Sequence, residues 1–156
     1  MSERLNKEIN KAVKDEIKNK YIVFRQGSSL VGIDLIYVKN VIIIQDVKIN
    51  QLPGNAMSCG VAKIRNEPIG LVNFNKWLGF KEEDENLLIL NCDIDGEKLG
   101  ILTADVVGII EVEEKDYRPG QHEKVRCLTY TEVNGSKDLV TIFDYKKMVN
   151  DIKNIK

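Results

Sequence analysis

From residue 21 onward, the chain is a succession of short apolar segments separated by residues that favour tight turns. The turn-forming sequences are Gln26-Gly27-Ser28, Leu52-Pro53-Gly54, Asp95-Gly96, Pro119-Gly120 and Asn134-Gly135. Glycine, asparagine and proline supply the backbone angles that hairpin turns need, so this pattern predicts short paired strands. About ten strands are predicted, at residues 21–26, 29–34, 38–45, 60–65, 67–74, 87–93, 97–103, 106–113, 126–133 and 138–143.

The composition agrees with a β-rich fold. A chain of 156 residues suits one compact domain or two small lobes in close contact. Apolar residues make up 43% of the chain and aromatic residues only 6%, so the core must consist mainly of valine, isoleucine and leucine. Two of these three are β-branched, which favours strands over helices.

Helices are predicted at both ends of the chain. Residues 1–20 form an extension in which Leu5, Ile9, Val13 and Ile17 recur every four residues among charged ones, as on one face of a helix. Near the other end, Asp144 can cap a helix over about residues 144–153, because its apolar positions lie three or four residues apart. A single helical turn is also predicted from Asn75 to Phe80, ending at Gly79.

The charge balance argues against several classes of function. Lysine and arginine total 23 against 24 for aspartate and glutamate, so the formal net charge is −1. A nearly neutral chain has no general field that attracts nucleic acid or an anionic membrane. No apolar run reaches the roughly 18 residues needed to cross a bilayer, and the N-terminus is charged where a signal peptide is apolar. We therefore expect a cytoplasmic protein that neither inserts into a membrane nor binds nucleic acid.

The residues that usually carry catalysis are sparse. Cys59, Cys92 and Cys127 are far apart and odd in number, which favours reduced core residues over disulfides or a metal site. The single histidine, His122, lies in a polar stretch with no nucleophile nearby in sequence, although it could meet a cysteine in space. We expect no enzyme activity and no cofactor.

One stretch partly resembles a calcium-binding loop. Asn91, Asp93 and Asp95 occupy suitable positions, but the twelfth position is Leu102, where such a loop needs a bidentate glutamate. A hairpin turn at Asp95-Gly96, joining two strands, is the better interpretation. No metal site is therefore predicted.

Between Cys59 and Phe74, a single arginine separates two apolar half-strands. A guanidinium carries five fixed donors and is costly to bury without partners. The apolar neighbours of Arg65 favour the interior, so we expect Arg65 at the rim of a groove.

This stretch resembles the corresponding motif of the CheW family of chemotaxis adaptors, usually Gly-Val-x-Asn-Leu-Arg-Gly followed by an apolar strand. The resemblance extends over roughly residues 21–150. Its other matching positions, in the family's order and spacing, are Tyr21 to Phe24, Gly32-Ile33-Asp34, Val38, Leu52-Pro53, Gly100 to Leu102, and Val106 to Ile109. The resemblance implies a mainly β fold of two interlocked five-stranded SH3-like β-barrels over residues 21–156.

The resemblance also implies a function. CheW-like proteins are non-enzymatic adaptors that couple the cytoplasmic tip of a chemoreceptor, a methyl-accepting chemotaxis protein, to the regulatory domain of the histidine kinase CheA. The groove between the barrels takes the receptor tip, and the end of one barrel pairs with the kinase. The positions that match the family's receptor-binding motifs are Val38, Gly60, Arg65, Gly100, Val106 and Ile109.

A kinase-binding surface is predicted on the strand Val41-Ile42-Ile43-Ile44. Its alternating apolar side chains cannot all be buried on one face of a barrel, so one set should be available to a partner. We predict that Ile42 and Ile44 form this set. Coverage of the strand on both sides by the chain's own helices remains an alternative.

Several positions depart from the usual family pattern. Asn66 replaces a glycine and Gly70 a common proline, while Asn73, Asn75 and Ala104 replace charged residues. Asparagine tolerates positive φ, so the turn after Arg65 can persist. The lost charges leave open a CheW-like fold with a different protein partner.

Other functions remain open alternatives. One is a small β-barrel that binds nucleic acid or another ligand, and another is an enzyme that uses Cys59 or Cys127. An adaptor that stands alone is expected rather than the adaptor half of a CheV-type protein, because no receiver domain follows residue 156.

Overall fold

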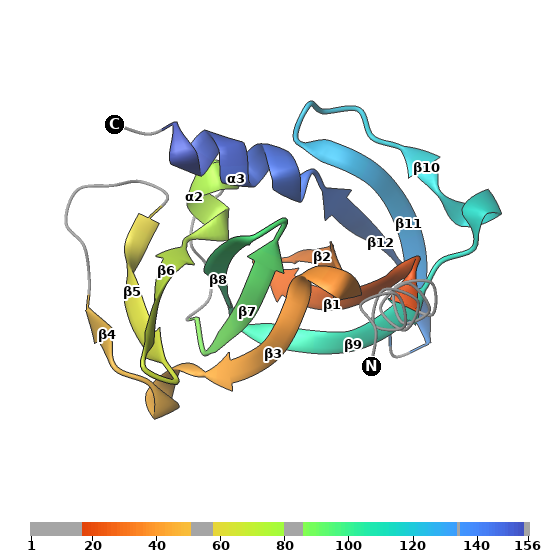
Figure 1. The fold of residues 1–156 in the computed structure, drawn as a ribbon. Helices are drawn as coiled ribbons and strands as arrows, with labels where there is room; N and C mark the ends of the chain where they lie inside the picture. The colour runs from red at the N-terminus through yellow and green to blue at the C-terminus, as the bar shows by residue number, and fades with distance from the viewer. Residues whose placement is uncertain (1–16, 51–57, 80–85, 134, 155–156) are drawn as a thin grey trace, which may run out of the picture.

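The computed structural model describes residues 17–50, 58–79, 86–133 and 135–154. Within these residues the fold is mainly β, with two six-stranded sheets and two α-helices (Figure 1). The predicted helix over residues 1–20 lies almost wholly outside the described residues.

The first sheet takes its strands from both ends of the chain. Their order across the sheet is β10-β11-β12-β2-β1-β9. The strands are β1 (Lys20–Gln26), β2 (Ser29–Asp34), β9 (Asp105–Glu111), β10 (Arg118–Pro119), β11 (Val125–Val133) and β12 (Ser136–Phe143). All neighbours are antiparallel except β12 and β2, which are parallel.

The second sheet is built from the middle of the chain, in the order β3-β7-β8-β6-β5-β4. Its strands are β3 (Val38–Ile43), β4 (Ile49–Asn50), β5 (Ser58–Ile64), β6 (Glu67–Val72), β7 (Leu88–Ile94) and β8 (Glu97–Thr103). Here too the two central strands, β6 and β8, are parallel and all other neighbours are antiparallel.

The two sheets share one topology. Each has two hairpins joined through a central parallel pair, and each has one further strand on either edge. Two of these edge strands, β4 and β10, are only two residues long and were not predicted. The repeat is thus visible in the pairing of the strands, although the sequence shows no convincing internal repeat.

Both helices begin at a side-chain cap. The Oδ1 of Asn73 accepts a hydrogen bond from the Lys76 amide before α2 (Phe74–Leu78), and Asp144 does the same for the Lys147 amide before α3 (Tyr145–Lys153). Gly79 ends α2 in the left-handed conformation, with φ of 77°. The predicted cap at Asp144 and the predicted stop at Gly79 are therefore confirmed.

One large core joins the two sheets and the two helices. It contains buried residues of β1, β2 and β12 from the first sheet, of β6, β7 and β8 from the second, and of α2 and α3. Phe74 lies at its centre, with ring centroids 5.3–6.0 Å from those of Phe24, Trp77, Phe143 and Tyr145. We call this cluster the shared core. Each sheet also has smaller clusters of its own, so many strands are buried on both faces.

Two tight hairpin turns have positive φ at both of their central residues. Asp95 and Gly96 join β7 to β8 with φ of 51° and 91°, which confirms the predicted turn. Arg65 and Asn66 join β5 to β6 with φ of 51° and 66°. Asn66 thus adopts the positive φ expected of it, whereas the positive φ of Arg65 was not foreseen.

Candidate functional site

The edge strands β3 and β9 present apolar side chains toward the space between the two sheets. Partners across an antiparallel ladder share a face. Val38 and Val41 pair with Cys92 and Leu90, which both belong to the shared core. On β9, Val106 and Ile109 pair with Phe24 and Ile22, which belong to it too. The shared core therefore extends outward to both edge strands.

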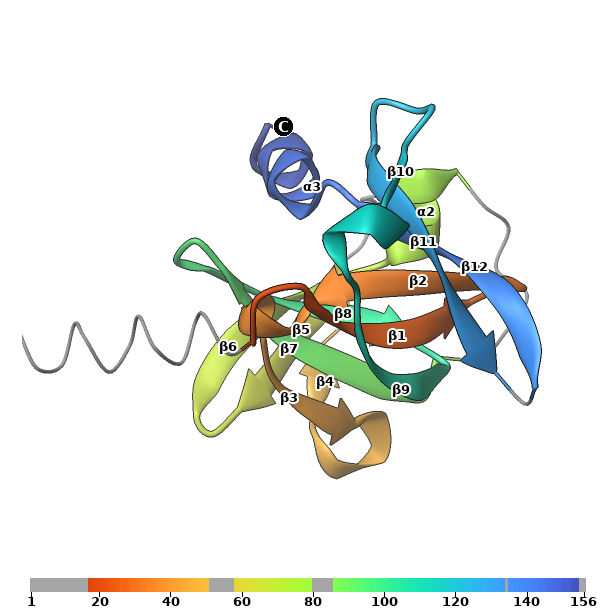
Figure 2. The ribbon, with the colours of Figure 1, turned by 90° about the vertical axis from the view of Figure 1, so that its right-hand side faces the viewer.

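At these edges the apolar side chains reach the surface. Val41, Ile43 and Ile109 are 42%, 52% and 62% exposed, while Val38 and Val106 are half-buried against the shared core. Both ribbon views place β3 and β9 on the side of the molecule opposite to α3 (Figures 1 and 2). We call these five residues the two-strand surface. It brings together three of the predicted receptor-binding residues, Val38, Val106 and Ile109.

A β-bulge decides which side chains of β3 belong to this surface. The register of β3 against β7 shifts between Val38 and Asn40, so that Val38 and Val41 share a face although they are three residues apart. Simple alternation from Val38 would instead have placed Ile42 and Ile44 on that face. Val41 and Ile43 were missed for this reason, since no residue in the strand signals the bulge.

Arg65 occupies the tip of the β5–β6 hairpin. Its side chain is exposed, and it makes no ion pair with another described residue. Figure 1 shows this turn on the same lower side of the molecule as β3 and β9. Arg65 is therefore accessible to a partner.

Gly60 and Gly100 are buried and flank one residue of the second sheet. Leu71 on β6 pairs with Gly60 of β5 on one side and with Gly100 of β8 on the other. A Cβ on Gly100 would lie 2.7 Å from Cγ2 of Ile89 and 3.0 Å from Cδ2 of Leu71. Close packing of the chain's own core thus explains the glycine at position 100, without approach by a ligand.

We expect Gly100→Ala to lower the free energy of unfolding by about 1–3 kcal/mol, because overpacking a close-fitting core costs that much. Ile89 is fully buried and branched at Cβ, so its methyl group cannot swing away freely. Chemical denaturation of the variant measures this loss. Gly70→Ala is the matched control, since a Cβ at that position meets nothing within 4 Å.

The predicted kinase-binding residues lie on the other face of the second sheet. Ile42 and Ile44 are half-buried and pack against that sheet's own small core. Leu87 extends the pairing of β3 with β7 beside them, since its carbonyl accepts a hydrogen bond from the Ile44 amide at 2.9 Å. The Leu87 residue is 49% exposed. These three residues form a second, smaller apolar area, which we call the Leu87 surface.

The departures from the family pattern at Asn73 and Asn75 lie inside the molecule. Asn73 caps α2 and Asn75 is in its first turn, and they are 8% and 4% exposed. Asn73 therefore has a structural role that an aspartate could also fill. Ala104, the third position at which a charged residue is replaced, is half-buried between β8 and β9.

The thiols of Cys92 and Cys127 are poorly suited to nucleophilic catalysis. Burial raises the pKa of the Cys92 thiol to about 12 and also raises the pKa of Cys127 above its ordinary value. His122 is exposed, and its Nδ1 accepts a hydrogen bond from the Lys124 amide at 3.1 Å. Among the described residues, no group of three or more potential ligands could hold a metal ion.

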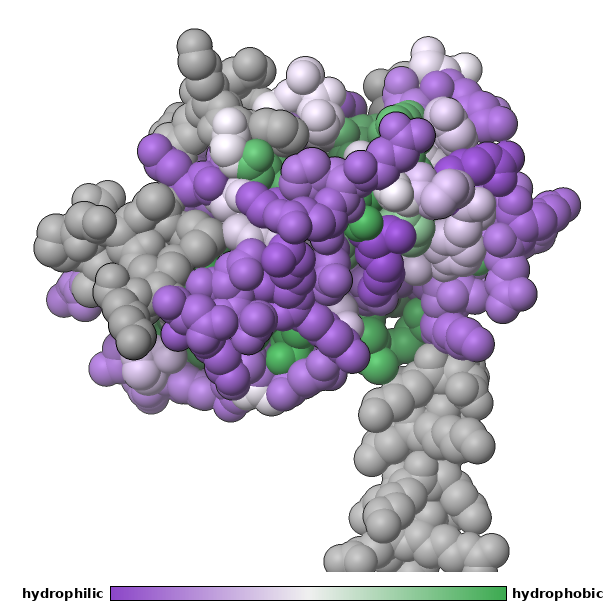
Figure 3. Space-filling view, turned by 90° about the horizontal axis from the view of Figure 1, so that it is seen from above, coloured by the Kyte–Doolittle hydropathy of each residue, from purple (hydrophilic) through white to green (hydrophobic). Residues whose placement is uncertain are grey.

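The face covered by α3 differs from the two apolar surfaces. Viewed from above, it is largely hydrophilic, with small hydrophobic areas between hydrophilic residues (Figure 3). Three lysines of α3 form ion pairs, Lys146 with Asp95, Lys147 with Asp151 and Lys153 with Glu97.

In the described part of the chain, no helix has the length and apolar character needed to cross a membrane.

Comparison with known proteins gives a consistent result. The model of the CheW-like domain family matches residues 20–153. The chain is also similar to "Chemotaxis protein CheW" of Treponema pallidum (strain Nichols), with 32% identity over 114 residues. That alignment covers 67% of this chain and 64% of the relative, so the chain spans slightly less than two thirds of the relative's length.

A solved structure has a similar fold. The scaffolding protein TtCheW from Thermoanaerobacter tengcongensis superposes with a TM-score of 0.69 and 21% sequence identity. The superposition covers 81% of this chain and 88% of that one. At this identity the likeness concerns the fold alone.

Proposed function

The chain belongs to the family of CheW-like domains, and on that basis we propose that it is a non-enzymatic chemotaxis adaptor that couples a chemoreceptor to the histidine kinase CheA. The observation that carries this proposal is the family match over residues 20–153, which takes in both sheets and α3. In this account residues 21–156 form the CheW-like domain, and residues 1–20 precede it. Each sheet with its own small core contributes one of the family's two interlocked SH3-like barrels.

The receptor tip is proposed to bind along the two-strand surface. Ile109 and Val41 offer exposed apolar contacts to a helical hairpin, and Val38 and Val106 support them from the shared core. Arg65, exposed at the hairpin tip, is free to make a charge-assisted hydrogen bond to a carboxylate or a helix C-terminus. Gly100 acts indirectly, because its lack of a side chain leaves room for Ile89 and Leu71, and Gly60 lies on the other side of Leu71.

The regulatory domain of the kinase is proposed to bind at the Leu87 surface. Ile42 and Ile44 lie at the margin of a core cluster that contains no residue of the first sheet, so a partner barrel can extend that cluster. This places the two partners on opposite faces of the second sheet. Both can then bind at once, as a coupling role requires.

We expect Leu87→Glu to weaken binding to the regulatory domain about fivefold or more, because it places a charge in an apolar contact. Isothermal titration calorimetry of the purified protein with that domain measures the effect. Leu139→Glu is the matched control, since Leu139 is 44% exposed on β12 of the other sheet. Equal affinities of the two variants would contradict the placement of the kinase at this surface.

The structure lends little support to a nucleic-acid module. Binding of single strands relies on exposed aromatic rings along a basic groove. Phe24, Phe74, Phe143 and Trp77 are instead all buried in the shared core. Contacts between proteins are the better explanation of the exposed aliphatic residues.

A further inference from the structure

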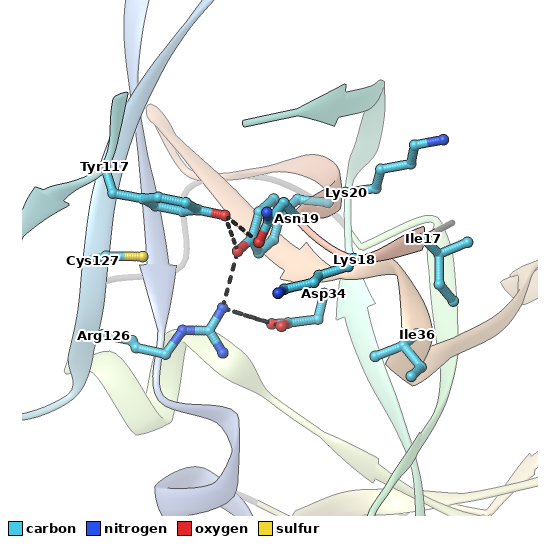
Figure 4. Close-up of a pocket in the computed structure, with 10 residues that line it drawn as sticks. Ile17, Lys18, Asn19, Lys20, Asp34, Ile36, Tyr117, Arg126 and Cys127 are labelled. Carbon is cyan, nitrogen blue, oxygen red and sulfur yellow. Dashed lines mark hydrogen bonds and ion pairs between the residues drawn. The ribbon is translucent and has the colours of Figure 1, made fainter. Parts of the chain in front are cut away.

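An open pocket lies where residues 17–20 meet the first sheet (Figure 4), and none of its lining residues belongs to either apolar surface. Its volume is about 620 Å³. The residues that line it come from the start of β1, the end of β2, the turn that follows β2, the segment before β10, and β11. They are Ile17, Lys18, Asn19, Lys20, Tyr21, Asp34, Ile36, Tyr117, Arg126 and Cys127.

A continuous network of hydrogen bonds fixes the polar wall of this pocket. The Nη2 of Arg126 donates to both carboxylate oxygens of Asp34, at 3.0 and 3.1 Å, and to the hydroxyl of Tyr21 at 3.4 Å. The hydroxyls of Tyr21 and Tyr117 lie 2.8 Å apart, and Tyr117 donates to Oδ1 of Asn19 at 3.1 Å. Tyr21 is only 4% exposed, so the network is anchored in the body of the protein.

The guanidinium of Arg126 is held in place but remains accessible. Its hydrogen bonds to oxygen atoms of the described residues all start from Nη2, and its side chain is 39% exposed. An arginine fork offers donors on three nitrogens. The guanidinium also interacts with the Cys127 thiol, and its remaining donors are within reach of a ligand, already oriented by the contacts of Nη2.

The charge around the pocket favours an anion. Lys18, Lys20 and Arg126 line it against a single carboxylate, Asp34, although the whole chain carries a formal charge of −1. Figure 4 shows the Lys20 side chain directed away from the ion pair, so it acts on a ligand at longer range.

The opposite wall is aliphatic. Figure 4 shows Ile17 and Ile36 across the pocket from Tyr117, Cys127 and Arg126, and Ile36 is 45% exposed. The ring of Tyr21 is not open to a nucleobase, because it is buried and the Arg126 guanidinium lies 5.9 Å from its centroid, so Tyr117 is the partly exposed ring among the lining residues. The pocket therefore suits a carboxylate that has an aliphatic neighbour.

We propose that this pocket docks an acidic segment of a protein partner, with a glutamate or aspartate carboxylate on Arg126 and an adjacent aliphatic side chain against Ile17 and Ile36. The fixed guanidinium supplies a directional contact and the two lysines supply attraction. The site shares no residue with the two-strand surface or the Leu87 surface. It would stand even if the adaptor proposal failed.

The test is a titration of the ¹⁵N-labelled full chain, followed by amide chemical shifts, with the peptide acetyl-Gly-Glu-Leu-Glu-Gly-amide. The control ligands are the same peptide with glutamine in place of glutamate, and inorganic phosphate. We expect saturable shifts at Asn19, Tyr21, Asp34, Tyr117, Arg126 and Cys127 with the acidic peptide only. Shifts of equal size with the glutamine peptide, or none at these amides, would overturn the proposal.

Variants separate docking from the structural role of the ion pair. Lys18→Glu is expected to weaken binding of the acidic peptide about threefold or more, because it reverses a solvent-screened surface charge beside the pocket. Lys63→Glu on β5 is expected to leave the affinity for the peptide unchanged. The double variant Asp34→Asn with Arg126→Gln keeps the pair neutral and able to hydrogen-bond, and it should abolish the shifts. Full binding by the folded double variant, or equally tight binding of phosphate at the same amides, would count against a peptide site.

Discussion

Replacing Phe74 with alanine is expected to lower the free energy of unfolding by about 3–5 kcal/mol, the usual cost of removing a buried phenylalanine. Phe74 is fully buried and contacts four other aromatic rings, from β1, α2, β12 and the start of α3. No small shift of the neighbours can fill such a space, because they belong to different elements. Denaturant unfolding followed by circular dichroism and by Trp77 fluorescence measures this loss.

The same experiment tests whether the two sheets fold as one unit. The shared core draws on strands of both sheets, so the two probes should report one coincident transition in the wild type and in the variant. Phe74→Leu is the control, and it should lose clearly less stability because it keeps most of the apolar volume. Separate transitions for the two probes would show that the sheets are stabilised independently.

Replacing Arg65 with glutamate is expected to weaken binding of the receptor tip by about 1–3 kcal/mol, through loss of a charge-assisted contact and introduction of a repulsive charge. The side chain is exposed at a hairpin tip, so the melting temperature should hardly change. Lys63→Glu reverses another exposed charge two residues earlier on β5 and serves as the control. Unchanged affinity with an unchanged melting curve would remove Arg65 from the binding surface.

Much of the fold could be predicted because its local signals are strong. The predicted strands at residues 29–34 and 97–103 agree with β2 and β8 at both ends, and turn residues mark their neighbours. The cap at Asp144 and the turn at Asp95-Gly96 depend on chemistry within a few residues. Such features need no knowledge of the rest of the chain.

The features that could not be predicted depend on contacts between distant segments. The strands β4 and β10 exist only because β5 and β11 offer them an edge, since two residues carry no periodic pattern. The network of Tyr21, Tyr117 and Arg126 joins residues about a hundred positions apart, and no local motif signals it.

The candidate site shows the same division. Its strands and its arginine could be recognised in the sequence. Which side chains of β3 are exposed depends on a bulge: Val41 and Ile43 reach the surface, whereas Ile42 packs against the small core of the second sheet. Gly100 matched a family motif, but the structure gives it a packing role beneath the surface. Motif positions alone therefore do not show which side chains reach the surface.

The central claim is that one molecule of this chain binds a receptor tip and the kinase at the same time. It is tested most directly by immobilising a chemoreceptor tip and measuring capture of the CheA regulatory domain from the same organism, with and without the chain. We predict that the chain increases capture of the kinase domain and that Arg65→Glu and Leu87→Glu each reduce the increase. Binding of either partner only in the absence of the other would contradict the account, as would capture that is unaffected by the chain.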